Sequence, residues 1–266
     1  MDCAVIRAVA VGVALLALTG CGGDDEPAAP TESQPVSHFT LYYIDGEHLH
    51  ATPATAQGAS PREAVEALLE NENGHPSEIP PRTKVNDVVV IDRKATVDLS
   101  REFVSGGGSA SMQARVAQVV YTLTQWSFVG RVTFEIDGEP VEAIGGEGVQ
   151  AHDVTRADLT NALPPIFVDP PPTWASSPLN IAGSARVFEA NVSFRLEANG
   201  ETIAQGFTTA AEGAPGRGDF AAMLPFEVDE PTDATLVVFE VSAADASETN
   251  VVRFPIRLCP RGNLPC

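Results

Sequence analysis

The chain has little positive charge, and this scarcity excludes several classes of partner. Of its 266 residues only 16 are basic, whereas 36 are acidic, and Lys84 and Lys94 are the only lysines. The formal net charge is therefore −20, and the isoelectric point lies near 4.4. Such a surface repels the phosphates of nucleic acids and the headgroups of anionic lipids, so we expect no direct binding to nucleic acid.

Sulfur-containing residues and tryptophan are also scarce. Four cysteines are too few to build a scaffold from disulfides. Three methionines and two tryptophans stand beside 21 prolines and 22 glycines, a composition that favours strands and turns over helix bundles. The hydrophobic share of 44% is ordinary for a globular protein and too high for a chain that is disordered throughout.

The apolar run at the amino terminus is too short to span a membrane. Residues 8–18 follow Arg7 and are apolar, whereas a spanning helix needs about 20 such residues, so the pattern predicts a signal peptide over residues 1–20. It ends in Leu18-Thr19-Gly20-Cys21, which resembles the lipobox of bacterial lipoproteins. The resemblance implies that Cys21 is acylated, with palmitate as one acyl chain, and becomes the mature N-terminus. The alternative is an ordinary secretory signal with a chance cysteine.

Residues 21–37 are predicted to be a lipidated cysteine and a disordered tether. The segment after Cys21 has three prolines, four acidic residues and no aromatic residue, so it has too little apolar area to fold. Two acyl chains supply the two signals that stable membrane residence needs. We therefore expect an extracytoplasmic protein on the outer face of the cell membrane, in contact with the bilayer through its lipid only.

Residues 38–150 mix helical and strand periods and predict an α+β domain. Strands are expected at 39–44, 85–91, 95–99 and 132–136 because apolar residues gather or alternate there. A helix is expected from the capping box at Ser60 and Glu63 to the turn at residues 73–74, and a second helix over the apolar stripe at residues 112–123.

Several motifs of this first domain occur together in one known family. They are Leu41-Tyr42-Tyr43-Ile44-Asp45-Gly46, Val97-Asp98-Leu99-Ser100 with Phe103, Tyr121-Thr122-Leu123-Thr124-Gln125 and Asp137-Gly138. In this order they resemble the GerMN domain of bacterial sporulation and germination proteins, over about residues 39–144. The family has no established catalytic residue or cofactor, so the resemblance implies a protein that is not an enzyme and that binds no cofactor.

After an expected linker at 151–163, residues 164–258 predict an all-β domain, followed by a tail at 259–266. Seven strands are expected at 165–168, 179–185, 188–198, 201–210, 220–228, 234–244 and 250–258, with Asn199-Gly200 as a hairpin turn. This spacing favours an immunoglobulin-like sandwich. Residues 177–191 and 218–220 are similar to the immunoglobulin-like domain of bacterial spore germination.

Two groups of residues are candidates for a site or a crosslink. Cys259 and Cys266 are expected to form a disulfide, because in the mature chain Cys3 is removed, Cys21 is blocked and the compartment is oxidising. Five polar residues could form a partner or ligand surface, or could instead cap the second helix and its loops. They are Ser100, Glu102, Thr122, Thr124 and Gln125.

Other patterns do not support a metal, phosphate or catalytic site. His48 and His50 would share one face if this segment were extended, but they lack an identifiable third ligand, and the glycines at 145–148 are not followed by the lysine of a phosphate-binding loop. The first function class is a tethered, non-catalytic interaction or assembly module that docks an envelope protein or cell-wall partner. The alternatives are a small-ligand-binding or sensing lipoprotein and, third, an envelope hydrolase.

Overall fold

The computed structural model describes residues 36–146, 148–262 and 265–266. The predicted signal peptide, the lipidation site Cys21 and residues 22–35 of the tether lie outside these ranges. Val36 and Ser37, which the sequence assigned to the tether, belong to the first strand. No helix in the described part of the chain combines enough length with enough apolar character to cross a membrane.

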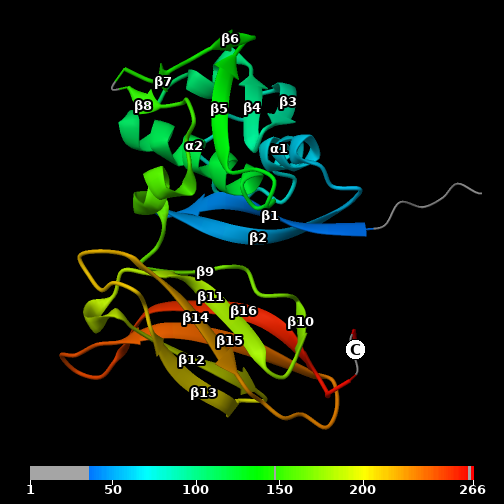
Figure 1. Ribbon diagram of the computed structural model, residues 1–266, viewed down its shortest axis with the longest axis vertical. Helices are drawn as coiled ribbons and strands as arrows, with labels where there is room; N and C mark the ends of the chain where they lie inside the picture. The colour runs from blue at the N-terminus through cyan, green and yellow to red at the C-terminus, as the bar shows by residue number, and fades with distance from the viewer. Residues whose placement is uncertain (1–35, 147, 263–264) are drawn as a thin grey trace, which may run out of the picture. The chain divides into compact units, whose positions relative to one another are not determined.

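The first domain is α+β, as predicted (Figure 1). Its elements are β1 (Val36–Asp45), β2 (His48–Gln57), α1 (Pro61–Glu70), β3 (Val85–Ile91), β4 (Lys94–Leu99), the 3₁₀ helix η1 (Arg101–Val104), α2 (Ser109–Leu123), β5 (Arg131–Ile136), β6 (Glu139–Pro140), β7 (Ala143–Ile144) and β8 (Val149–Gln150). β1 pairs with β2, β7 pairs with β8, and β3-β4-β5-β6 form a four-stranded sheet. In that sheet β4 and β5 run parallel, with α2 in the connection between them.

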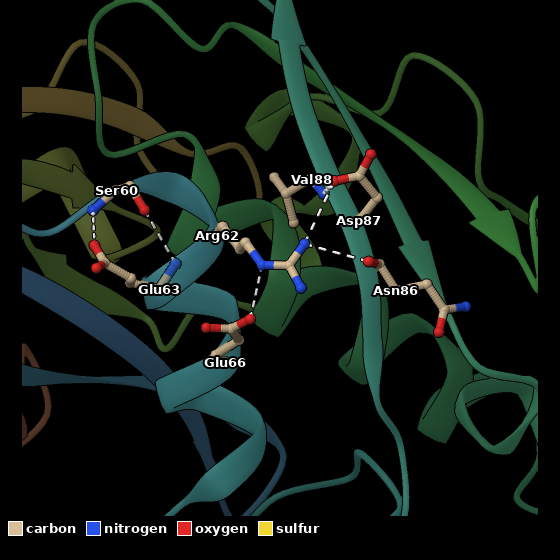
Figure 2. A network of polar contacts seen from close by, with 7 residues as sticks. All are labelled: Ser60, Arg62, Glu63, Glu66, Asn86, Asp87 and Val88. Atoms are coloured by element: carbon tan, nitrogen blue, oxygen red, sulfur yellow. Dashed lines mark hydrogen bonds and ion pairs between the residues drawn. The ribbon is translucent and has the colours of Figure 1, made fainter.

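The start of α1 shows how local sequence positions this helix against the sheet. The predicted capping box is confirmed, since Ser60 N–H donates to Glu63 Oε2 at 2.7 Å and Glu63 N–H donates to Ser60 Oγ at 3.3 Å (Figure 2). Arg62 then bridges outward: its Nε pairs with Glu66 at 2.8 Å and its Nη1 donates to the Asn86 carbonyl of β3 at 3.2 Å. The helix ends earlier than predicted, with Asn71 in the left-handed region as its cap.

The periodic patterns predict the core of the first domain well. The apolar stripe of α2 is buried throughout, and in β4 Ala95, Val97 and Leu99 are fully buried while the residues between them are half-buried. Burial of this apolar area stabilises the domain by about 25 cal/mol per Å² removed from water. Phe103 lies in the same core, with its ring stacked on that of Phe134 at 5.7 Å between centroids.

Two parts of the first domain differ from the sequence expectation. β2 was not predicted, and it forms a hairpin with β1 across the turn at Gly46, whose φ is 62°. Residues 151–163, expected to be only a linker, contain the 3₁₀ helix η2 (Arg156–Ala162). Ala151, Val154 and Leu163 of this segment are buried in the first core, so it is more than a connection.

The second domain is the predicted all-β sandwich (Figure 1). Its elements are β9 (Ile166–Val168), β10 (Trp174–Ser176), β11 (Leu179–Ala185), the 3₁₀ helix η3 (Phe188–Ala190), β12 (Asn191–Ala198), β13 (Glu201–Thr209), β14 (Gly218–Leu224), β15 (Thr232–Val241) and β16 (Glu248–Cys259). One sheet has the order β10-β16-β15-β12-β13 and the other β14-β11-β9. The inward alternation of Val192, Phe194 and Leu196 fills the core between them.

The second domain also differs in detail from the expected strands. β10 was not predicted, and it pairs parallel with the end of β16. The strand expected from residue 188 begins only at Asn191, because Glu189 and Ala190 have φ values of 53° and 57° and form a tight turn. β14 ends at Leu224, earlier than residue 228. Cys259 and Cys266 are joined by a disulfide, with Cα atoms 5.7 Å apart.

Candidate functional site

Two of the five predicted site residues, Thr122 and Gln125, hold α2 against β1. The amide of Gln125 accepts from Thr40 N–H at 2.7 Å and donates to the Thr40 carbonyl at 2.9 Å. Thr122 is fully buried, and its Oγ1 accepts from Tyr42 N–H at 3.3 Å. Thr124 donates back to the Val120 carbonyl within its own helix. These polar groups satisfy backbone atoms and are not free to bind a ligand.

We predict that Gln125→Ala destabilises the first domain. The substitution leaves both backbone groups of Thr40 without their partner, and each lost hydrogen bond of this kind costs about 1 kcal/mol, more where the group stays buried. The free energy of unfolding should fall by about 1–3 kcal/mol in urea titrations. Gln113→Ala is the matched control, because Gln113 is exposed on α2, the helix that Gln125 follows. Equal losses in both variants would show that the hydrogen bonds between Gln125 and Thr40 do not stabilise the domain.

Ser100 and Glu102 lie elsewhere, beside an open cleft at the start of β3. Ser100 Oγ accepts from Lys84 N–H at 3.0 Å, and this hydrogen bond joins the residue before β3 to the residue after β4. A hydrogen bond from the Ser100 side chain lowers the pKa of Glu102, so this carboxyl is ionised at neutral pH. The cleft, of ≈ 650 Å³, is also lined by Arg82 and Arg101, and Arg101 pairs with Asp137 at 2.7 Å.

The structure therefore divides the predicted site into two separate networks. Within the described ranges, no hydrogen bond connects Ser100 or Glu102 with the α2–β1 clamp of Thr122 and Gln125. The polar residues that sequence reasoning missed in this domain are Gln118 and Arg115, both buried on α2. Gln118 bonds the backbone of Glu78, and Arg115 donates to the Phe103 carbonyl at 2.6 Å, so both are structural.

A second surface was not anticipated, and it lies on the outer face of the five-stranded sheet. Here Phe188 is 57% exposed and Phe207 is 70% exposed, at the edge of an open groove of ≈ 920 Å³. We call this feature the aromatic groove and define it by the residues that shape it. They are Phe188, Ser193, Phe207, Phe239 and Val241.

Strand pairing explains how the groove forms from distant parts of the chain. Ser193 of β12 lies directly opposite Phe207 of β13 on one side and Phe239 of β15 on the other. Side chains alternate between the two faces of a strand, and Phe194 and its partner Gly206 face the core. A Cβ on Gly206 would lie 2.9 Å from the Phe194 ring, so this glycine makes room for the core while Phe207 points outward.

Acidic side chains surround the aromatic groove. Arg195 covers the buried ring of Phe239, with Cζ 4.7 Å from the ring centroid, and Glu248 Oε1 lies 2.6 Å from its Nη1. The hydrogen bond that Arg195 donates to Glu248 is the main reason that the pKa of Arg195 is raised, although burial opposes the shift. Glu197 also pairs with this guanidinium. Glu197 is shared with Arg253 at 3.6 Å, so the acidity of the groove comes from Glu189 and Glu248, which line it beside the cation Arg195.

Two further sequence motifs, the histidines at 48 and 50 and the glycine-rich segment near 145, lie in the hairpins β1–β2 and β7–β8. His48 and His50 both lie on β2 on the face opposite the buried Leu49. Among residues 36–146, 148–262 and 265–266, no group of three or more His, Cys, Asp or Glu side chains is arranged to hold a metal ion. Gly145, with a φ of 72°, lies in the turn between β7 and β8.

Comparison with protein families identifies both domains. Residues 40–142 match the family described as "Sporulation and spore germination", and residues 170–247 match the "Immunoglobulin-like domain of bacterial spore germination". Both resemblances inferred from the sequence are confirmed, as is the order of an α+β domain before an immunoglobulin-like one. None of the curated proteins compared with this chain gives a significant match.

Solved structures give weaker likenesses. The first GerMN domain of the sporulation protein GerM from Bacillus subtilis is 26% identical, with a TM-score of 0.38 over 46% of this chain and 98% of that one. The tandem GerMN domains of the same protein are 19% identical, with a TM-score of 0.40 over 72% and 62% of the two chains. A candidate lipoprotein of Clostridium perfringens is 18% identical, with a TM-score of 0.35 over 47% and 91%. At these TM-scores none of them supports a functional argument.

Proposed function

Since this chain combines a sporulation and spore germination domain with the immunoglobulin-like domain of bacterial spore germination, we propose that it is a lipid-anchored, extracytoplasmic interaction protein of the cell envelope. In this role it binds a partner and catalyses no reaction. The anchor is Cys21, and residues 22–35 link it to the first domain.

The observation that carries the proposal is the aromatic groove. The side chains of Phe188 and Phe207 are 57% and 70% exposed, so most of their apolar area faces water instead of the core. Single exposed apolar residues are common on protein surfaces, but a group of them at one groove indicates an interaction surface. The polar residues first considered for a ligand surface mostly bond backbone atoms instead. Binding of a protein partner therefore explains more of the exposed surface than chemistry within a cleft.

The anchor complements this role physically. A chain of net charge −20 is repelled by an anionic bilayer, so it needs a covalent lipid to remain at the membrane. Two acyl chains on Cys21 would provide stable residence, and fourteen or so tether residues reach roughly 45 Å when extended. The folded domains would then be presented to partners at a distance from the headgroups.

We predict that Cys21→Ala abolishes acylation in a bacterial host. Metabolic labelling with a palmitate analogue should mark the unchanged chain and leave the variant unlabelled, because only the thiol of Cys21 lies at the lipobox position. Cys3→Ala is the matched control, since Cys3 lies within the predicted signal peptide and should not affect labelling. Equal labelling of the unchanged chain and Cys21→Ala would exclude the anchor.

The interaction role is tested by crosslinking in intact cells. The full chain should enrich a discrete envelope protein over a control that carries only residues 1–37. If no protein is enriched, or if the purified full chain hydrolyses a cell-wall or ester substrate, the proposed function is wrong.

A further inference from the structure

We infer that the aromatic groove binds an extended, basic protein segment, which inserts one bulky apolar side chain above Ser193. This inference deepens the proposed function, because it names the chemistry of the partner and the place where the partner docks. It follows from three features of the groove, namely its shape, its exposed apolar surface and its charge.

The shape of the groove comes from one small residue between two large ones. Ser193 has Phe207 and Phe239 as its direct cross-strand neighbours. Neighbouring strands lie about 4.8 Å apart, so the backbones of the two phenylalanines are about 10 Å apart, and the small serine side chain between them leaves a notch. A single aliphatic or aromatic side chain placed above Ser193 would contact the exposed ring of Phe207 on one side and, on the other, the Arg195 guanidinium that covers the buried ring of Phe239.

The exposed apolar residues extend the notch along the sheet. Val241, 47% exposed, and Phe188 lie at the same groove, and Phe188 is fixed in place because its N–H donates to Glu240 Oε1 at 2.7 Å. Phe188 sits on the tight turn formed by Glu189 and Ala190. An incoming segment that covers these residues removes their apolar area from water, and this is the driving force that we assign to binding.

Charge decides which occupant fits. Glu189 and Glu248 line the groove and Glu240 lies behind Phe188. Arg195 is the basic residue among the described residues that line the groove, and it is already paired with Glu197 and Glu248. A second copy of this chain would bring another net charge of −20, and an anionic membrane would be repelled in the same way. Lysine or arginine residues on either side of an apolar residue complement this rim.

The test uses synthetic peptides and the full chain in a neutral detergent. The probe is a nine-residue fluorescent peptide, Lys-Lys-Thr-Lys-Phe-Lys-Thr-Lys-Lys, and the controls replace its central Phe by Ala or every Lys by Glu. Fluorescence anisotropy should show saturable binding of the probe, at least about tenfold weaker binding of the Ala peptide, and no binding of the Glu peptide. Added salt should weaken binding of the probe.

Two variants distinguish binding in the notch from non-specific hydrophobic binding. Ser193→Leu fills the notch and also adds apolar surface. If the notch receives the central Phe of the probe, binding should fall at least about tenfold; if exposed apolar area alone drives binding, it should rise. Met223→Ser removes an apolar side chain that is 71% exposed on β14, in the other sheet, and should leave binding unchanged.

Each contrary outcome has a distinct meaning. The inference is overturned if no peptide binds, if the Phe and Ala peptides bind equally, or if Ser193→Leu binds as the unchanged chain does. Self-association that Ser193→Leu abolishes would assign the groove to a second copy and would also overturn it. If Ser193→Leu and the unchanged chain capture the same envelope protein equally in cells, the proposed function is kept but the groove is not the binding site. If the unchanged chain captures no protein, the proposed function itself is rejected.

Discussion

Phe103→Ala is expected to lower the free energy of unfolding of the first domain by about 3–5 kcal/mol, the largest loss that we predict for a single substitution. Phe103 is fully buried, although it lies on η1, a helix of only four residues. Its ring stacks on Phe134 of β5, with an angle of 13° between the ring planes. Truncation removes this aromatic pair and leaves a cavity, and a short helix held at both ends has little freedom to collapse into it.

The backbone of Phe103 adds a second reason for a large effect. Its carbonyl accepts from the buried guanidinium of Arg115, which also donates to the carbonyls of Ser105 and Gly106. Movement of η1 into the cavity would strain these charge-assisted hydrogen bonds. Phe128→Ala is the matched control, because Phe128 is 49% exposed, and its cost should be well under 1 kcal/mol. Urea titrations followed by circular dichroism measure both, and similar losses would show that η1 relaxes freely.

Local sequence patterns correctly predicted those elements that are stabilised by residues close together in the chain. The capping box at Ser60 and Glu63 and the turn at Asn199-Gly200 depend on residues a few positions apart, and both are present. The alternation in β4 was equally informative because one face of the strand is wholly buried. β2 escaped prediction because Leu49 is its only buried apolar residue and Pro53 interrupts the run, a pattern that argues against a strand.

The sites depend on contacts between distant residues, which spacing cannot reveal. Gln125 and Thr40 are 85 positions apart, so the sequence left both a binding role and a structural role open, and the hydrogen bonds of Gln125 favour the structural one. The aromatic groove requires the register of three strands. The inward alternation of Val192 and Phe194 implies that Ser193 faces outward, but only strand pairing places Phe207 and Phe239 beside it.

Tyr121 should make the folded protein sensitive to alkaline pH. Its side chain is buried, and this burial raises the pKa of Tyr121 to about 12, although the Arg156 guanidinium, 4.7 Å from the ring centroid, acts to lower it. In the unfolded chain the phenol ionises near its ordinary pKa of about 10. The folded state therefore holds the proton more tightly, so this contribution to stability is complete below about pH 10 and is lost as the pH rises towards about 12.

We predict that the unchanged chain loses up to about 3 kcal/mol more stability than Tyr121→Phe between about pH 10 and about pH 12, since two pKa units correspond to about 2.7 kcal/mol. At neutral pH the variant should differ little, because the Tyr121 hydroxyl makes only a long hydrogen bond of 3.4 Å to the Arg156 carbonyl. Urea titrations across this pH range measure the difference. Tyr43→Phe is measured beside it: burial also raises the pKa of Tyr43, so its curve should differ from that of the unchanged chain in the same direction. If the curves of the unchanged chain and Tyr121→Phe run parallel, Tyr121 does not keep its proton in the folded state, and the buried environment assigned to its hydroxyl is wrong.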